Sequence, residues 1–203
     1  MLVLDHLAVA SNSLAEGAAF VAEKLGITMA PGGQHPRFGT HNLLIGLEDG
    51  LYLEVISIDP EAKAPKDPRW FDLDSFEGPP RLHNWIVRCD DMSVALPQLP
   101  AGAGREVALA RGDLRWKMAV PETGKLPFDE VCPALIEWQG RHPAASLPQS
   151  GARLKELVLC HPAAAALAAP IQPLMQDVRL RFETAAVPAM RACFEIDGED
   201  RWL

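Results

Sequence analysis

The sequence has little of what would tie it to a membrane, to nucleic acid or to a disulfide framework. It has no run of about 18 apolar residues, and no basic segment followed by an apolar stretch opens the chain. Acidic residues outnumber basic ones by 27 to 19, and the net charge is −8 without a lysine and arginine cluster. The four cysteines lie far apart and form no C-x-x-C pair, so we interpret them as reduced core residues. We therefore expect a cytoplasmic protein with no membrane or nucleic-acid partner.

Common catalytic and nucleotide-binding signatures are also missing. No G-x-S-x-G elbow, P-loop or G-x-G-x-x-G segment follows a strand-like run, which argues against a serine hydrolase and a nucleotide cofactor. The composition is typical of a globular protein, with 203 residues of which 48% are hydrophobic and 23% charged. This length suits one medium domain or two small modules that share a core.

An internal repeat is the main organising feature of the chain. Residues 4–26 predict a strand, a turn capped by Ser11 or Ser13, and a helix that ends at Gly26. Further strands are expected near 27–30, over 40–47 and over 50–58. The same order returns as a strand and short helix in 81–99, followed by strands over 105–111, 113–121 and 131–139. A third start at 154–175, with two strands behind it, predicts a C-terminal βαββ half-module.

We expect these units to form a single domain over residues 1–203. Its parts are module one (1–58), a connector (59–80), module two (81–142) and the C-terminal half-module (150–203). The five prolines of the connector exclude regular structure, whereas Trp70 and Phe71 make it too apolar for a free tether. We therefore expect the connector to be pinned over the sheet and to cover a pocket.

Two polar residues interrupt apolar strands in module one. His6 lies in LDHLAVA (4–10), where an imidazole among apolar side chains needs a partner. Glu54 lies in LYLEVISI (51–58), where an unpaired ionised carboxylate would cost several kcal/mol. A local hydrogen bond is the simplest explanation for either residue alone.

A tandem βαβββ unit with a histidine in its first strand and a glutamate in its last resembles the vicinal oxygen chelate superfamily. The segment GGQHPRFGTHN (32–42) before LYLEVIS (51–57) resembles the glyoxalase-like domain branch of that superfamily in particular. The resemblance implies an α+β fold in which tandem modules form a curved mixed sheet around a cavity. Members of the superfamily often hold a divalent metal there, and their chemistry includes isomerisation, epimerisation and ring-cleaving oxygenation as well as plain binding.

The resemblance also implies a site. It places the first and fourth strands of a module side by side, which would bring His6 next to Glu54, and Glu137 in CPALIEW matches Glu54 in module two. These three side chains would suit Zn, Ni, Fe(II) or Mn. One of the two carboxylates, Glu54 or Glu137, would then act catalytically by moving a proton between adjacent carbons.

The fourth metal ligand is where the sequence departs from the superfamily pattern. Counting from the helices, Asn84 rather than His83 matches His6 in module two. Because strand side chains alternate, Asn84 would face the cavity as a substrate-binding residue and His83 would face away, unless a bulge shifts the register and makes His83 a ligand. A neutral amide is a weak metal ligand, so the site would then be degraded.

Polar side chains at the rim of the expected cavity are candidates for substrate binding. In the segment 32–42, His35, Thr40 or Asn42 would contact a polar substrate and Arg37 would hold a carboxylate. A well-capped loop explains the same residues equally well. Trp138, next to Glu137, would line the ligand site, although aromatic packing also accounts for it.

Two functions remain open from the sequence. The first is a metal-dependent enzyme, a lyase, isomerase or dioxygenase, that acts on a small oxygen-rich or carbonyl-containing metabolite. The second is a metal-free protein that binds a small molecule in the same cavity, with His6 paired to Glu54. Either form could be a monomer or a homodimer.

Overall fold

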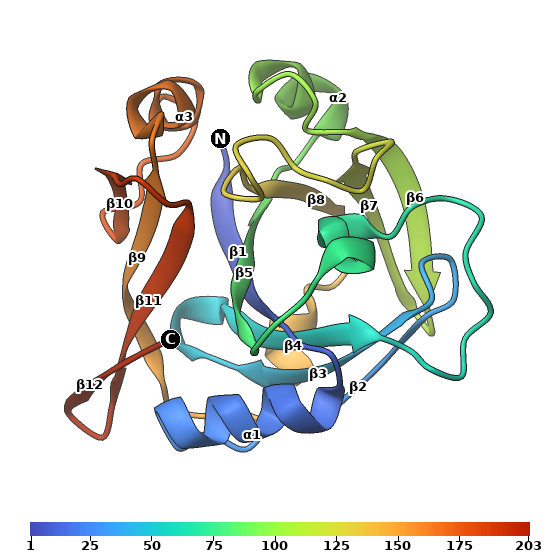
Figure 1. The fold of residues 1–203 in the computed structure, drawn as a ribbon, viewed down its shortest axis with the longest axis vertical. Helices are drawn as coiled ribbons and strands as arrows, with labels where there is room; N and C mark the ends of the chain where they lie inside the picture. Colours follow the sequence, from blue (N-terminus) through green and yellow to red (C-terminus); the bar gives the residue numbers. More distant parts are fainter.

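The computed structural model describes residues 1–203, and its main feature is one curved sheet of eight strands that runs through both modules (Figure 1). The strand order in this sheet is β2-β3-β4-β1-β5-β8-β7-β6. A second sheet of four strands, ordered β10-β9-β11-β12, lies beside it. The fold is therefore α+β, as the sequence predicts.

Three units of similar element order follow one another along the chain. The first contains β1 (Val3–Ala10), α1 (Leu14–Leu25), β2 (Ala30–His35), β3 (Thr40–Gly46) and β4 (Tyr52–Ile58). The second contains β5 (Arg81–Arg88), α2 (Met92–Ala95), β6 (Arg105–Arg111), β7 (Leu114–Val120) and β8 (Ala134–Trp138). The third contains β9 (Arg153–His161), α3 (Ala164–Ile171), β10 (Leu180–Thr184), β11 (Ala189–Ile196) and β12 (Glu199–Trp202).

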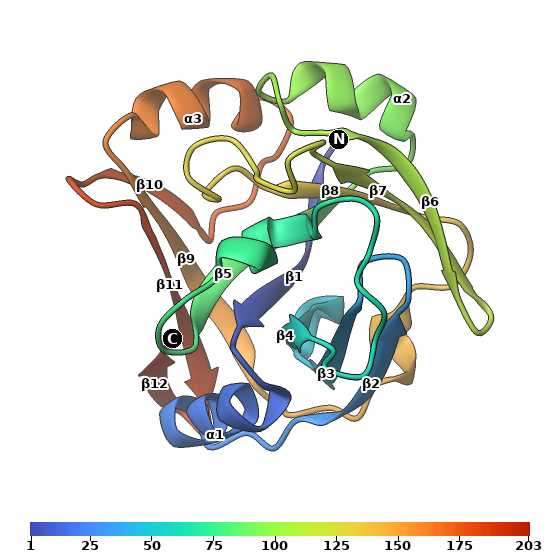
Figure 2. The same cartoon turned by 45° about the vertical axis from the view of Figure 1, so that its right-hand side comes forward.

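Local sequence signals place the ends of helix α1. The Ser13 hydroxyl accepts a hydrogen bond from the backbone N–H of Glu16, which satisfies one of the free donors of the first turn. Gly26 ends the helix in the left-handed conformation, at a φ of 72°. Val21 and Leu25 face the core, and the helix packs below β3 and β4 (Figure 2). None of the helices combines the length and the apolar character that a membrane span requires.

The first and fourth strands of each module are parallel neighbours. β1 pairs with β4, β5 pairs with β8, and an antiparallel β1–β5 pair joins the two modules at the middle of the sheet. Ala8 lies opposite Glu54 on one side and opposite Asn84 on the other. Residues that are paired across strands face the same side, so Glu54 and Asn84 share the concave face.

Two elements differ from those the sequence predicts. β2 begins at Ala30 and continues to His35, through two glycines that suggested a loop. Gly32 is needed there because a Cβ atom would lie 2.2 Å from Oδ1 of Asn42. The C-terminal unit has one strand more than the expected βαββ pattern, because the polar segment Glu199–Trp202 pairs with β11.

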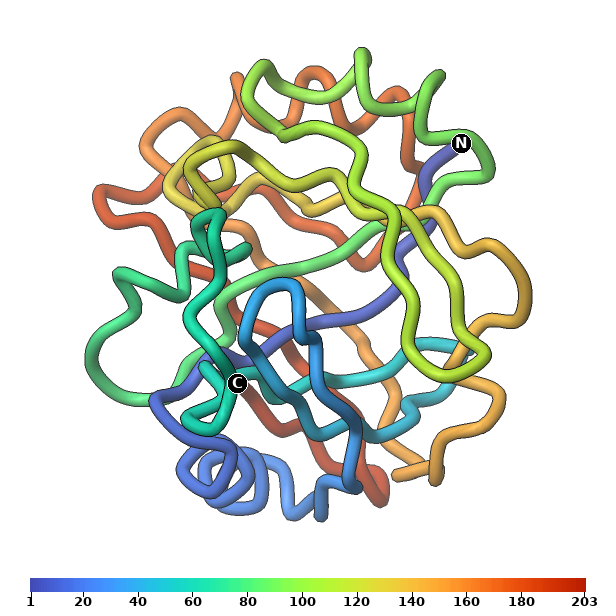
Figure 3. The backbone as a smooth tube through the Cα atoms, turned by 90° about the vertical axis from the view of Figure 1, so that its right-hand side faces the viewer, coloured from blue at the N-terminus to red at the C-terminus, as the bar shows by residue number.

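The connector is pinned over the concave face of the sheet. Its helical segment, Trp70–Ser75, buries Trp70, Phe71 and Leu73. Nε1 of Trp70 donates a hydrogen bond to Oγ1 of Thr40 at 3.2 Å, and the Trp70 ring stacks on Phe38. The backbone trace shows the connector beside the β2–β3 hairpin (Figure 3). The sequence-based expectation of a pinned connector is confirmed.

Candidate active site

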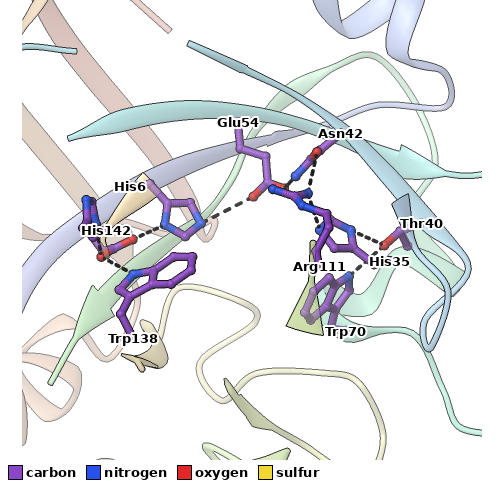
Figure 4. A network of polar contacts seen from close by, with 10 residues as sticks. His6, His35, Thr40, Asn42, Glu54, Trp70, Arg111, Trp138 and His142 are labelled. Atoms are coloured by element: carbon purple, nitrogen blue, oxygen red, sulfur yellow. Dashed lines mark hydrogen bonds and ion pairs between the residues drawn. The ribbon is translucent and has the colours of Figure 1, made fainter. Parts of the chain in front are cut away.

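A small cavity of about 40 Å³ lies on the concave face, where the connector crosses the sheet. Its walls are mainly aromatic and come from both modules and the connector: Tyr52, Trp70, Phe71, Trp116 and Trp138. Four polar side chains face the same space: His6, His35, Glu54 and Arg111. Their contacts form a continuous network (Figure 4).

Glu54 is the carboxylate of this cavity. It is only 5% exposed, and Nδ2 of Asn42 donates a hydrogen bond to its Oε1 at 2.6 Å. Its Oε2 lies 3.4 Å from Nε2 of His6. Burial alone would raise the pKa of Glu54, but the hydrogen bonds and positive charge of its neighbours outweigh burial and lower this pKa. Glu54 is therefore ionised at neutral pH.

His6 lies between two carboxylates. Its Nδ1 lies 2.6 Å from Oδ1 of Asp5, its Nε2 faces Glu54, and its ring stacks on Tyr52 with centroids 4.2 Å apart. Burial opposes the charged form, yet the two carboxylates raise the pKa of His6 to about 8. A protonated imidazole donates from both nitrogens, which matches these contacts.

Asp5 supports His6 from behind. The side chain of Asp5 is fully buried, and its Oδ2 accepts hydrogen bonds from Nε1 of Trp138 at 3.0 Å and from Nε2 of His142 at 2.8 Å. Burial would raise the pKa of Asp5, but the two histidines lower it far below its ordinary value. Asp5 therefore stays ionised and fixes the orientation of the His6 ring.

His35 and Arg111 form the other polar end of the cavity. Nη1 of Arg111 lies 3.2 Å from Nε2 of His35 and 3.3 Å from Oδ1 of Asn42. Because Arg111 can only donate, Nε2 of His35 is the acceptor, and its Nδ1–H donates to Oγ1 of Thr40 at 3.2 Å. Burial, together with the charge of Arg111, lowers the pKa of His35 to about 4. His35 is therefore neutral.

The structure brings together several of the residues that the sequence singles out. The residues that line the cavity are His6, His35, Glu54 and Trp138. Thr40 and Asn42 do not line it, but Thr40 is hydrogen-bonded to His35 and Asn42 to Glu54. Arg37 does not join them, because it is exposed at the surface and lies 3.8 Å from Asp67. Arg37 is therefore not among the residues that line this cavity.

Glu137 also lies outside the cavity. Side chains alternate along β8, and Ile136 and Trp138 are the ones that line the cavity. Glu137 points to the opposite face, where its Oε2 accepts a hydrogen bond from the backbone N–H of Met92 and its Oε1 lies 3.5 Å from Nζ of Lys117. The expectation that Glu137 joins Glu54 in one cavity is corrected by this alternation.

His83 and Asn84 lie at a register shift in the β1–β5 pairing, where Ala8 pairs with Asn84 and Val9 with Leu82, so that His83 has no partner in β1. Asn84 is on the concave face, but its Nδ2 donates to Oε2 of Glu130 at 3.2 Å and its Oδ1 has no partner. The ring of His83 turns toward the connector, where its Nε2–H donates to the carbonyl of Phe71 at 2.9 Å, and it does not line the cavity. The bulge that the sequence leaves open is therefore present at His83, but it does not bring the ring into the cavity beside His6 and Glu54.

The donors in the cavity do not fit the four-ligand metal site that the superfamily pattern implies. Only His6 and Glu54 of the expected set face the space, whereas protein zinc sites use three or four protein ligands. No group of three or more His, Cys, Asp or Glu side chains is arranged to hold a metal ion. Arg111 also brings a permanent positive charge to the same space.

Sequence reasoning missed Asp5, Arg111 and His142. Asp5 precedes His6 and would normally face the opposite side of the sheet, but a register shift between Leu4 and His6 turns the two side chains together. Arg111 ends a strand of alternating polar and apolar residues, where it resembles any solvent-facing arginine. His142 precedes a proline and resembles a turn residue. No local signal marks these three residues.

Several solved structures are similar to this chain. The chain resembles a hypothetical protein from Staphylococcus aureus with a TM-score of 0.60 and 12% sequence identity, over 93% of this chain and 88% of that chain. It also resembles methylmalonyl-CoA epimerase from Mycobacterium tuberculosis, with a TM-score of 0.44 and 15% identity over 70% of this chain and 91% of that one. A variant of methylmalonyl-CoA epimerase from Streptomyces coelicolor, in complex with 2-nitronate-propionyl-CoA, is similar with a TM-score of 0.44 and 15% sequence identity. The match covers 68% of this chain and 97% of that chain.

No curated protein matches the chain. A family model described as Glyoxalase-like domain matches residues 4–175, which include both modules, the connector and the start of the third unit. This chain therefore belongs to the glyoxalase-like domain family.

Proposed function

We propose that this protein is an enzyme that moves a proton on a small carbonyl-bearing metabolite, with Glu54 as the general base. The observation that carries the proposal is the environment of Glu54: an ionised, buried carboxylate that faces a mainly aromatic cavity. A base in a water-poor site is well placed to take a proton from a carbon next to a carbonyl group.

The proposed step is redox-neutral. A C–H bond next to the carbonyl breaks, the proton passes to a carboxylate oxygen of Glu54, and the bonding electron pair moves onto the carbonyl oxygen to give an enolate. Return of the proton to either face of the same carbon completes an epimerisation. Where that carbon carries a hydroxyl group, the hydroxyl proton moves to the enolate oxygen, the proton on Glu54 passes to the neighbouring carbon, and the carbonyl group forms on the first carbon, which completes an isomerisation. The positive charge of Arg111 at the polar end of the cavity stabilises the negative oxygen.

His6 and Asp5 position the base in this proposal. The chain Asp5–His6–Glu54, with contacts of 2.6 and 3.4 Å, fixes one oxygen of Glu54, while Asn42 holds the other. The positive charge of His6 keeps Glu54 ionised and ready to accept a proton. No step depends on a metal, because the cavity offers His6 and Glu54 alone of the expected donor set.

A metal-free binding protein is the second candidate. The observation that favours it is the apolar wall that module two gives the cavity, which includes Met118 and Ile136. Such a protein would bind the same small molecules without turnover.

The test is proton exchange in D₂O. Three- and four-carbon carbonyl compounds are incubated with the protein, and loss of the C–H signal next to the carbonyl is followed by ¹H NMR. We expect exchange with the wild-type protein and its loss in Glu54→Gln, while Glu137→Gln, which changes the carboxylate outside the cavity, keeps it. Exchange that persists in Glu54→Gln would refute the role of Glu54. Binding without exchange in the wild-type protein would favour the second candidate.

A further inference from the structure

Arg111 is a positive charge without a negative partner. It is the one lysine or arginine side chain that lines the cavity, and it forms no ion pair. Its near polar contacts, His35 and Asn42, are both neutral groups that accept from a single nitrogen, Nη1. A guanidinium group has five N–H donors, so most of its donating capacity is unused.

The remaining charges of the site already compensate one another. Glu54 faces the protonated His6. Asp5 faces His6 and His142 and lies 3.6 Å from Nη1 of Arg88. Tyr52, the other titratable group of the cavity, is neutral because burial raises its pKa well above its ordinary value. The positive charge of Arg111, which is partly buried, is therefore the one left free for a bound molecule to balance.

The size of the cavity limits that molecule. A buried water needs roughly 10–15 Å³ of such volume, so about 40 Å³ corresponds to roughly three waters. Three waters occupy roughly 90 Å³ as liquid, which is close to the volume of an organic acid with three or four carbons. The aromatic walls suit a short carbon chain, and the guanidinium group of Arg111 suits a negatively charged group at the end of that chain.

From this geometry we infer that the cavity selects small monocarboxylates, and that Arg111 binds their carboxylate group through its free N–H donors. A carboxylate matches the planar fork of a guanidinium, and the pair would leave the cavity without net charge. The inference rests on the proposed function in one respect, since Glu54 then faces the carbon chain of the acid. The combined assignment is proton transfer on a three- or four-carbon carboxylate that carries a carbonyl group.

The competing explanation is that Arg111 only holds His35 and Asn42 in place. A holding role predicts equal loss of affinity for charged and uncharged ligands when Arg111 is replaced. A carboxylate-binding role predicts a loss that is specific to the charged ligand. The two explanations therefore differ in a quantity that can be measured.

The experiment is isothermal titration calorimetry with pyruvate, 2-oxobutyrate and the uncharged methyl ester of pyruvate. The proteins are the wild type, Arg111→Gln, Arg111→Lys and Arg105→Gln, an exposed arginine on the same strand that serves as the control. We expect the wild type and Arg105→Gln to bind at least one acid more tightly than the ester. Arg111→Gln should bind that acid at least tenfold more weakly, with little change for the ester, and Arg111→Lys should lie between.

Three results would overturn the inference. They are equal affinity of the wild type for acid and ester, no binding of either acid, or unchanged acid binding in Arg111→Gln. If Arg111→Gln does not fold, two measurements still test the inference. They are the affinities of the wild type for acid and ester, and the same two affinities of Arg111→Lys. Acid binding that depends on Arg111, without C–H exchange in D₂O, would refute the proposed function and leave this inference standing. C–H exchange in D₂O without tighter binding of acids than of the ester would refute this inference and leave the proposed function standing.

Discussion

Asp5 and His6 are consecutive residues of one strand, yet their side chains meet on the same side of it, with Oδ1 and Nδ1 2.6 Å apart. Neighbours in a regular strand point to opposite faces. A register shift in the β1–β5 pairing, between Leu4 and His6, makes the contact possible. The shift converts a lone histidine into the middle member of a carboxylate–imidazole–carboxylate chain.

Replacing Asp5 by asparagine should destabilise the fold. The change places an amide N–H₂ group among the N–H donors of His6, Trp138 and His142, and it leaves the charge of His6 with one carboxylate fewer. Breaking a buried ion pair in this way costs about 3–5 kcal/mol. Urea denaturation of Asp5→Asn measures the loss, and Asp113→Asn, a change at an exposed aspartate, is the control. A loss below about 1 kcal/mol would contradict the buried network.

The stability of the protein should fall as the pH rises through the pKa of His6. This pKa is raised from 6.5 to about 8, so protonated His6 stabilises the fold fully below pH 6.5, and that contribution is lost as the pH passes 8. The difference corresponds to about 2 kcal/mol. Glu130, whose pKa burial raises to about 7, produces a fall at lower pH, so the informative range begins above pH 7.

Urea denaturation between pH 7 and 9 tests this dependence. The wild type should lose stability with rising pH in this range, and His6→Gln should lose much less. The chemical shifts of the His6 ring, followed by NMR over the same range, report its pKa directly. A His6 pKa at or below 6.5 would show that the carboxylates do not stabilise the charged imidazole.

The close approach of the connector to module two depends on Gly124. This residue has a φ of 77°, and a Cβ atom would lie 1.9 Å from the carbonyl oxygen of Arg69, next to the cavity wall residue Trp70. Gly112 also has a positive φ, 57°, but nothing lies within 4 Å of a Cβ built there. We expect Gly124→Ala to be less stable than Gly112→Ala by about 1–3 kcal/mol. Both variants carry the strain of an alanine at positive φ, so the difference between them reports the steric clash at position 124.

Thermal denaturation of both variants measures that difference. Tryptophan fluorescence should change in Gly124→Ala, because the displaced connector carries Trp70 away from Thr40 and Phe38. Equal stability of the two variants would show that the Arg69–Gly124 approach does not constrain the connector.

Divalent metal should bind weakly to this protein. His6 and Glu54 are two donors beside a permanent positive charge, and a structural or catalytic zinc site needs at least three protein ligands. We expect protein dialysed against a chelator and then against Zn, Ni, Fe(II) or Mn to retain well under one equivalent by elemental analysis. Retention of a full equivalent, lost in His6→Ala, would restore the four-ligand interpretation and require Glu137 or His83 to move.

The arrangement of strands could be predicted from the sequence because it depends on patterns that extend over many residues. Alternating apolar residues predict the strands, and capping signals such as Ser13 and Gly26 predict the ends of the first helix. Together they give the order of one strand, one helix and three strands in each module. β12 could not be found in this way, because Glu199–Trp202 has no apolar alternation and becomes a strand only by pairing with β11. Its position depends on tertiary contacts.

The candidate site was predictable only in part, because a shift of one residue along a strand moves a side chain to the opposite face of the sheet. His6 and Glu54 lie together, since parallel β1 and β4 bring Ala8 opposite Glu54. Glu137 was assigned by analogy between the modules, and β8 places Ile136 on the cavity face instead. Arg111 faces the cavity from a strand 57 positions away from Glu54, which local pattern cannot reveal.

The two modules repeat the same order of elements but contribute different chemistry to the shared cavity. Module one supplies the carboxylate and both imidazoles, while module two supplies the guanidinium and the apolar wall of Trp116, Met118, Ile136 and Trp138. Substitutions in β6, β7 or β8 would therefore alter the wall and the charge that a bound molecule meets, while Glu54 and its direct partners His6 and Asn42 lie in module one. The base and most of the wall that a ligand contacts therefore lie in different copies of the repeated unit.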